Sequence, residues 1–204
     1  LFTDPTYKRM YYEDFREERA VPKTFRDYNR VASFFTRGCN AASPTQYGST
    51  VAIGNVVVSP SEFMPRLFAE NGRLLDSQGR ITLDTPEALR ALENYRETYS
   101  YSDRTIYDFW KNALEGFADG TAAMTVVFIN YASHILNSQM SRIAGKLGFA
   151  PVPGGKPLLG GGVIGIAQSC TCPAAACKFL EWLYADLVAP VFTMLGGLSP
   201  CRSA

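Results

Sequence analysis

Amphipathic helical patterns alternate with short apolar runs along most of this 204-residue chain. Between Phe25 and Phe35, apolar side chains recur every three or four residues, which is the spacing of one helix face. The run Thr121–Ile129 is instead mostly apolar throughout and rich in β-favouring residues, which is typical of a strand buried on both faces. The alternation of helices with few, short strands predicts an α/β domain with more helix than sheet.

Local start and stop signals set the expected boundaries. Thr24 is placed to cap a helix with Asp27 in its first turn. Gly79 suits the turn of a small hairpin over 73–83, and Thr85-Pro86 opens a further helix. Helices are expected over 4–18, 25–38, 59–71, 107–118, 131–143, 173–184 and 187–195 and from Pro86 onward, with strands over 50–53, 121–129, 147–151 and 163–167.

Size and charge narrow the class of protein further. A chain of this length can bury a substantial core and suits one domain better than two. Its 20 basic and 19 acidic residues leave a net charge of +1, which offers no electrostatic footprint for nucleic acid or an anionic membrane. The apolar runs are shorter than the roughly 20 residues of a spanning helix, and no signal peptide is recognisable. Because the sequence starts without Met, we interpret it as a mature or truncated piece.

The five cysteines admit three interpretations. Cys170, Cys172 and Cys177 are close enough in sequence to suggest a metal site, with Cys39 and Cys201 further away. A single histidine and the absence of paired Cys-x-x-Cys elements argue against zinc. A disulfide between Cys172 and Cys177 is an alternative in an exported protein, and free, partly buried thiols are the interpretation that we favour. We therefore expect no metal and no cofactor.

No catalytic constellation stands out. A Ser-His-Asp arrangement would have to use His134 beside Ser133, and no nucleophile elbow is present. Glu93 and Glu97 share a helical face, but a solvated face explains them better than a glycosidase pair. We expect a protein that is not an enzyme.

The glycine-rich run Leu159–Gly165 is similar to a phosphate-binding loop only superficially. No Gly-Lys-Ser/Thr follows it, and a strand is expected next in place of a helix. Two interpretations stay open: a flexible connection with positive φ angles, or backbone amides brought close to a ligand.

Five motifs occur in the order found in one known family. They are Pro22-Lys-Thr-Phe-Arg-Asp-Tyr, Phe68-Ala-Glu-Asn-Gly-Arg-Leu-Leu-Asp, Ile81-Thr-Leu-Asp-Thr-Pro-Glu-Ala-Leu-Arg-Ala-Leu, Ala113-Leu-Glu-Gly-Phe-Ala-Asp-Gly-Thr-Ala-Ala-Met-Thr, and Gly148-Phe-Ala-Pro-Val-Pro-Gly-Gly with Leu159-Gly-Gly-Gly-Val-Ile-Gly-Ile. Each is weak by itself, but five in register across about residues 20–200 are specific. In this order the chain resembles the family 1 extracellular solute-binding proteins, which include maltose-binding protein and many sugar-binding lipoproteins.

The resemblance implies a fold and a division of the chain. Members have two α/β lobes of the type II periplasmic-binding-protein fold, which close on the ligand like a hinge. Residues 1–169 are then expected to be the second lobe, helix-rich with a short mixed sheet. Residues 170–204 would be a helical segment that packs on the first lobe, most of which would precede Leu1.

The resemblance also implies a function. Such a protein is the substrate-capturing component of an ABC importer: it binds a solute, here expected to be a carbohydrate, outside the cell membrane or in the periplasm and delivers it to the permease subunits. Contact with the membrane is expected only through a lipid anchor outside this piece. A carbohydrate-active enzyme and a ligand-sensing or interaction module without a transport role are the alternatives.

Ligand contacts in this family lie in loops that follow strands, which agrees with the rule for open α/β sheets. The corresponding residues here are Asn55, Ser59, Ser61 and Glu62 after the first strand, Asn130 and Tyr131 after the strand at 121–129, and Gly160, Gly161 and Gly162. Trp110 is a further candidate, although an aromatic residue on an amphipathic helix is more often part of the core. The sugar-stacking tryptophan of maltose-binding protein corresponds roughly to Asn130, which argues against a maltodextrin and leaves a smaller or different carbohydrate open.

Overall fold

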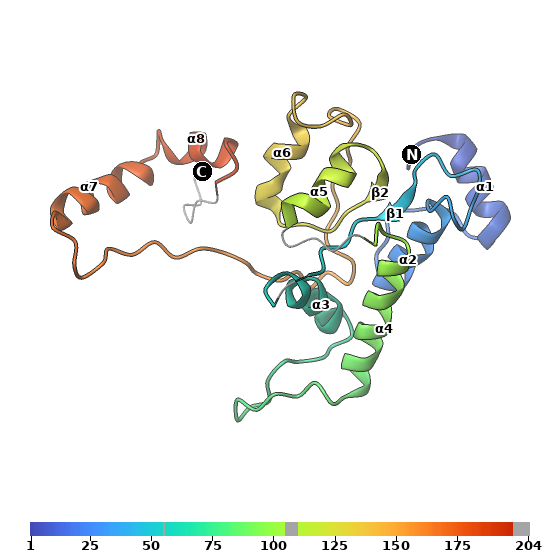
Figure 1. The fold of residues 1–204 in the computed structure, drawn as a ribbon, viewed down its shortest axis with the longest axis horizontal. Helices are drawn as coiled ribbons and strands as arrows, with labels where there is room; N and C mark the ends of the chain where they lie inside the picture. The colour runs from blue at the N-terminus through green and yellow to red at the C-terminus, as the bar shows by residue number, and fades with distance from the viewer. Residues whose placement is uncertain (55, 105–109, 198–204) are drawn as a thin grey trace.

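The computed structural model describes residues 1–54, 56–104 and 110–197 of the chain. Its helices are α1 (Pro5–Phe15), α2 (Phe25–Phe34), α3 (Val58–Ala69), α4 (Pro86–Ser100), α5 (Trp110–Ala118), α6 (Ala132–Leu136), α7 (Pro173–Leu183) and α8 (Ala189–Met194), with a 3-10 turn η1 (Ile129–Tyr131). Two strands, β1 (Tyr47–Ser49) and β2 (Ala122–Met124), lie between them (Figure 1). The prediction of a helix-rich α/β domain is confirmed.

The two strands run parallel, with Tyr47 opposite Ala122 and Ser49 opposite Met124. Both are shorter than predicted, and β1 lies three residues before the expected strand at 50–53. After β1, the amide of Thr50 extends the ladder by donating to the carbonyl of Met124 at 3.2 Å. Beyond it, the buried backbone of Ala52 bonds to side chains instead, which ends the sheet. No strand is present over 147–151 or 163–167 in the described part of the chain, and Val163 is fully exposed.

Aromatic side chains build the core beside this sheet. Tyr11 of α1 meets Phe34 of α2 edge-on at 5.2 Å, and Phe34 meets Phe35 in the same way at 5.0 Å. Tyr28, Val31, Ala32 and Met124 complete the buried cluster. Edge-to-face pairs of this kind add stabilisation beyond the area that they bury. A second buried cluster lies where α3 packs along α4 through Leu67, Ala88 and Ala91.

The predicted cap of α2 is confirmed. The Thr24 hydroxyl accepts from the amide of Asp27 at 3.1 Å and donates to the Asp27 carboxylate at 2.7 Å. It therefore satisfies one of the amides that the first helical turn leaves unpaired. The hairpin at 73–83 is also confirmed in its essentials, since Leu75 and Ile81 form an antiparallel bridge and Gly79 turns with φ 76°.

We expect Thr24→Ala to lower the free energy of unfolding by about 1 kcal/mol, because the amide of Asp27 loses its acceptor. Thr24→Ser keeps a hydroxyl at the same position and serves as the control. Urea unfolding followed by circular dichroism measures both variants. Equal stability of Thr24→Ala and Thr24→Ser would contradict a capping role for this hydroxyl.

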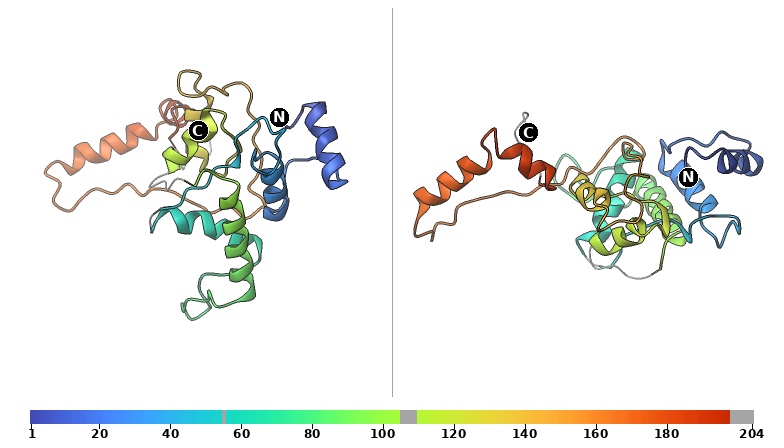
Figure 2. Two further views of the ribbon diagram at one scale, coloured as in Figure 1. Left: turned by 45° about the vertical axis from the view of Figure 1, so that its right-hand side comes forward. Right: turned by 90° about the horizontal axis from the view of Figure 1, so that it is seen from above.

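The C-terminal helices form an arm beside the rest of the structure. From Lys156 to Ala167 the chain has no helix or strand, and Figures 1 and 2 show α7 standing away from helices α1 to α6. No residue of α7 is buried, and Phe179 and Trp182 are more than half exposed. The chain then returns through α8, whose final turn at Gly196 lies against Asn130 and Ser133. Within the described residues, no helix combines the length and the apolar character needed to cross a membrane.

Candidate functional site

The loops that leave the two parallel strands start at the same edge of the sheet. The hydroxyls of Thr50 and Thr125, one residue beyond each strand, lie 2.8 Å apart in a hydrogen bond. The chain then leads from β1 into the start of α3 and from β2 into η1. Residues 50–54, 56–61 and 125–131 are therefore brought together at the carboxyl ends of the strands, where open α/β sheets bind ligands.

An aromatic pair lies at this edge. Trp110, the first residue of α5, meets the ring of Phe128 edge-on with centroids 5.4 Å apart. Gly160 approaches the same ring so closely that a Cβ atom there would be 2.8 Å from it. Of the predicted residues, Trp110 and Gly160 are thus brought together through Phe128. Sequence reasoning missed Phe128, which looked like an ordinary position of a buried strand.

Trp110 also rests on the core. It packs against the buried cluster of Ala52, Val58 and Ala113, so that β1's exit loop, α3 and α5 all support it. The tryptophan is neither fully buried nor fully exposed. Both interpretations of Trp110 left open by the sequence, core and ligand contact, are compatible with this position.

Asn130 and Tyr131 lie on η1, directly after Phe128. Tyr131 is half-buried against Leu114, Ala118 and Ile135, and this burial raises the pKa of its phenol. The carbonyl of Asn130 accepts from the hydroxyl of Ser133 at 3.2 Å. The strand predicted at 121–129 is shortened to β2, and the helix predicted at 131–143 is shortened to α6.

The residues predicted in the first loop have varied surroundings. Ser59 accepts from the amide of Gly54 at 3.3 Å, and Ser61 donates to the carbonyl of Val57 at 2.9 Å. Asn55 lies outside the described residues. Gly161 and Gly162 are exposed with no atom near the position of a Cβ, and they do not join the aromatic pair.

Glu62 is buried and its carboxylate is already engaged. One oxygen accepts from the amide of Ala52 at 3.1 Å, and the other pairs with Arg66 at 3.1 Å. Arg66 is 2 % exposed, donates to Thr98 at 3.3 Å, and its guanidinium lies over the rings of Phe25 and Tyr95. Burial raises the pKa of Glu62, and the attraction of Arg66 only partly opposes this.

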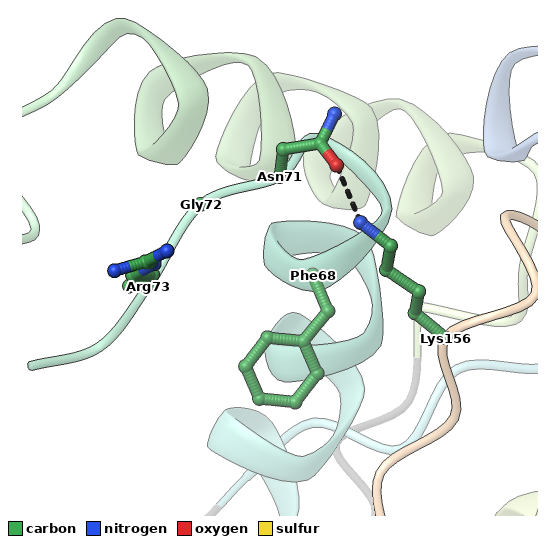
Figure 3. A pocket seen from close by; sticks show the side chains of 5 residues that line it. All are labelled: Phe68, Asn71, Gly72, Arg73 and Lys156. Atoms are coloured by element: carbon green, nitrogen blue, oxygen red, sulfur yellow. Dashed lines mark hydrogen bonds between the residues drawn. The ribbon is translucent and has the colours of Figure 1, made fainter.

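A hollow of about 340 Å³ lies at the other end of α3. It is lined by Phe68, Asn71, Gly72, Arg73 and Lys156, whose arrangement is drawn in Figure 3. The ammonium of Lys156 donates to the amide oxygen of Asn71. Ser59 and Glu62 belong to the first turns of α3, so this hollow is separate from the edge described above.

The groups considered for metal binding and catalysis are dispersed. Among the described residues, no three His, Cys, Asp or Glu side chains cluster closely enough to hold a metal ion. Cys39, Cys170, Cys172 and Cys177 are free, and Cys201 lies outside the described residues. His134 lines a second hollow with Lys111, Glu115 and Asp119.

Comparisons with known proteins all lead to solute-binding proteins. Residues 6–204 match the family model described as bacterial extracellular solute-binding protein. A putative ABC transporter periplasmic-binding protein of Escherichia coli K12, YcjN, is 27% identical over 97 residues, which are 48% of this chain and 21% of that protein.

Two solved structures share the fold. The solute-binding protein of Thermotoga lettingae TMO with bound α-D-tagatose superposes with a TM-score of 0.75 and 26% identity, over 95% of this chain and 50% of its own. The maltose-bound MalE3 of Thermotoga maritima superposes with a TM-score of 0.75 and 23% identity, over 96% of this chain and 51% of the MalE3 chain. The chain therefore spans about half the length of these structures, and its matched segment covers about a fifth of the curated relative.

Proposed function

The chain belongs to the bacterial extracellular solute-binding proteins, and we propose that it is part of the solute-capturing component of an ABC importer. Its ligand would be a carbohydrate, bound at the edge where β1 and β2 end. The observation that carries this proposal is the meeting of Trp110, Phe128 and Gly160 at that edge. An aromatic surface suits the C–H face of a sugar, while nearby hydroxyl, amide and backbone groups suit its hydroxyls.

Several predicted residues would take part. Trp110 would supply the aromatic contact. Hydrogen bonds to the sugar would come from Ser59, Ser61, Asn130, Tyr131 and the amides of Gly160, Gly161 and Gly162. Asn55 is proposed as a ligand contact from the sequence alone. The carboxylate of Glu62 is fully engaged by Ala52 and Arg66, so we propose an indirect role for it.

We further propose that residues 1–169 form one lobe and that 170–204 pack on a second lobe in the full protein. The exposed Phe179 and Trp182 of α7 support this division, because neighbouring large apolar side chains on a protein surface mark a site of contact with another part of the protein or with a partner. The two-lobed protein would work at the extracellular face of the membrane or in the periplasm and deliver its sugar to permease subunits. A lipid anchor would lie outside residues 1–204.

A carbohydrate-active enzyme is the less favoured alternative, and we propose that the chain has no catalytic role. Hydrolysis of a glycoside needs two carboxyl groups facing the sugar. Glu62 is the one acidic residue among those predicted to face the ligand, and it is buried in an ion pair. Release of nitrophenol from nitrophenyl glycosides by the purified chain would contradict this view.

A thermal-shift and calorimetric screen of the chain tests the function. We expect a small sugar to raise the melting temperature when present well above its dissociation constant, because a ligand that binds only the folded state stabilises it. The panel would include tagatose and other monosaccharides, maltose, peptides and polyamines. Binding to this one lobe should be weak, since closure of two lobes normally surrounds the ligand.

Trp110→Ala is expected to weaken binding of the responding sugar about tenfold or more, which corresponds to the loss of roughly 1.4 kcal/mol of contact energy. Tyr12→Ala is the matched control, because Tyr12 is a half-exposed aromatic residue of α1 outside this edge. A response to peptides or polyamines but to no sugar would keep the family and overturn the ligand. Equal weakening by both variants would overturn the site.

A further inference from the structure

The backbone that leaves β1 is buried without a strand to pair with. Ala52 is 1 % exposed, yet the ladder with β2 has already ended at Thr50. A buried peptide group that lacks a hydrogen bond is strongly unfavourable, so the amide and the carbonyl of Ala52 both need partners.

Side chains from two helices supply these partners. Glu62 of α3 accepts from the Ala52 amide at 3.1 Å, and Tyr95 of α4 donates to the Ala52 carbonyl at 3.3 Å. Ser59 of α3 accepts from the Gly54 amide at 3.3 Å, and its influence partly opposes the rise in the pKa of Tyr95. Three polar backbone groups within three residues are therefore held by three side chains, which we name the Ala52 clamp: Ser59, Glu62 and Tyr95.

The clamp is itself held in place. Tyr95 and Phe25 enclose the guanidinium of Arg66, with distances of 5.1 and 4.7 Å to the ring centroids. Burial and the nearby Glu62 raise the pKa of Tyr95 to about 12. The phenol consequently keeps its proton at neutral pH and remains a donor to the carbonyl of Ala52.

Ala52 connects the clamp to the aromatic pair. It shares a buried cluster with Val58 and Ala113, and Trp110 packs on that cluster. A displacement of Ala52 would therefore move part of the support beneath Trp110, and with it the surface that meets Phe128.

We infer that Ser59, Glu62 and Tyr95 are positioning residues, which fix the exit of β1 and thereby the orientation of Trp110 for ligand binding. The role in ligand binding rests on the proposed function, whereas the clamp itself does not. Tyr95 is the new assignment, because it belongs to α4 and its position in the sequence lies outside every loop predicted to face the ligand.

Tyr95→Phe tests the inference, because it removes only the phenolic hydroxyl. We expect the amides of Ala52 and Gly54 to exchange with deuterium about five- to tenfold faster, the change that follows from the net loss of one hydrogen bond. Tyr28→Phe is the control: it also removes a hydroxyl of a buried tyrosine, which is bonded to Ser49 of β1 at 2.8 Å. Ser59→Ala is a second clamp variant, with the expected increase centred on Gly54.

The orientation of Trp110 is measured by acrylamide quenching of its fluorescence, in a background in which Trp182→Phe leaves Trp110 as the one tryptophan. Quenching should rise in Tyr95→Phe and stay unchanged in Tyr28→Phe. Unchanged exchange at Ala52 and Gly54, or equal quenching in both variants, would overturn the inference. Neither measurement needs a sugar, so a screen in which no sugar binds would defeat the proposed function alone. If a sugar such as tagatose does bind, its affinity should fall at least threefold in Tyr95→Phe beyond the change in Tyr28→Phe, and equal affinities would also overturn the positioning role.

Discussion

We expect Gly48→Ala to lower the free energy of unfolding by about 3 kcal/mol or more, a large share of the stability of an ordinary domain. Gly48 is the central residue of β1 and lies directly on the backbone of α2. A Cβ atom at Gly48 would stand 1.8 Å from the carbonyl oxygen of Ala32 and 2.3 Å from its carbonyl carbon. Because these are backbone atoms of a buried helix, they cannot move aside as a side chain would.

Relief of this clash would break several bonds at once. The amide of Gly48 donates to the carbonyl of Tyr101 at 3.0 Å and to the hydroxyl of Thr36 at 2.9 Å. Pushing β1 away from α2 would lengthen both bonds and disturb the pairing with β2. We therefore expect the loss to affect the whole domain and not only the strand.

Gly38→Ala is the matched control. Gly38 is exposed, and no atom lies within 4 Å of the position that its Cβ would occupy. Its effect should stay within about 0.5 kcal/mol. Urea unfolding of both variants, followed by circular dichroism and tryptophan fluorescence, measures the difference. A Gly48→Ala protein as stable as Gly38→Ala would mean that β1 does not pack on α2 as described.

The elements that could be predicted are those determined by neighbouring residues. The cap at Thr24, the hairpin turn at Gly79 and the start of α4 at Thr85 depend on side chains a few positions apart, and all three are confirmed. The resemblance to a solute-binding family rested on motifs of the same local kind, and the family match over 6–204 confirms it. The helix-rich α/β class followed from the alternation of helical patterns with short apolar runs.

The limits of the strands depend on distant residues, which a local pattern does not reveal. The segment 50–53 is apolar enough for a strand, but its backbone bonds to Glu62 and Tyr95, 10 and 43 residues beyond Ala52. The run 121–129 was predicted as a strand buried on both faces. It leaves the sheet after Met124, and Phe128 turns to Trp110 instead. At 163–167 an apolar run is exposed, so that composition alone predicted the wrong structure.

The candidate site contains some features that local sequence predicts and others that depend on distant residues. That the loops after the strands share an edge follows from parallel pairing, and the family resemblance pointed to residues in those loops. The convergence of Trp110, Phe128 and Gly160 required the tertiary structure, because 18 and 32 residues separate neighbouring members along the chain. The engagement of Glu62 by Arg66 also required it, because an i,i+4 pair on a helix is exposed far more often than buried.

The second large effect concerns this buried pair. Arg66→Met should lower the free energy of unfolding by about 3–5 kcal/mol at neutral pH, because the carboxylate of Glu62 then stays buried without a counter-charge. Met keeps much of the volume between Phe25 and Tyr95, so the loss reports mainly on charge. The double variant Glu62→Gln/Arg66→Met should regain a large part of it, since Gln is neutral and its side-chain oxygen can still accept from the amide of Ala52.

The pH dependence of Arg66→Met separates this charge effect from poor packing. The pKa of Glu62 in the folded protein is already raised by burial, and loss of Arg66 removes the largest influence that lowers it. A carboxyl group whose pKa is raised on folding contributes stability below its unfolded pKa, and that contribution is lost as the pH rises through its folded pKa. The deficit of Arg66→Met should therefore be largest at neutral pH and shrink as the pH falls toward the ordinary glutamate value of about 4.3. Urea unfolding at a series of pH values measures the stability deficit of Arg66→Met and of the double variant Glu62→Gln/Arg66→Met. In the double variant the deficit should not vary with pH in this way. A deficit that is constant with pH would assign the loss to packing around Phe25 and Tyr95 and would remove the ion pair as its cause.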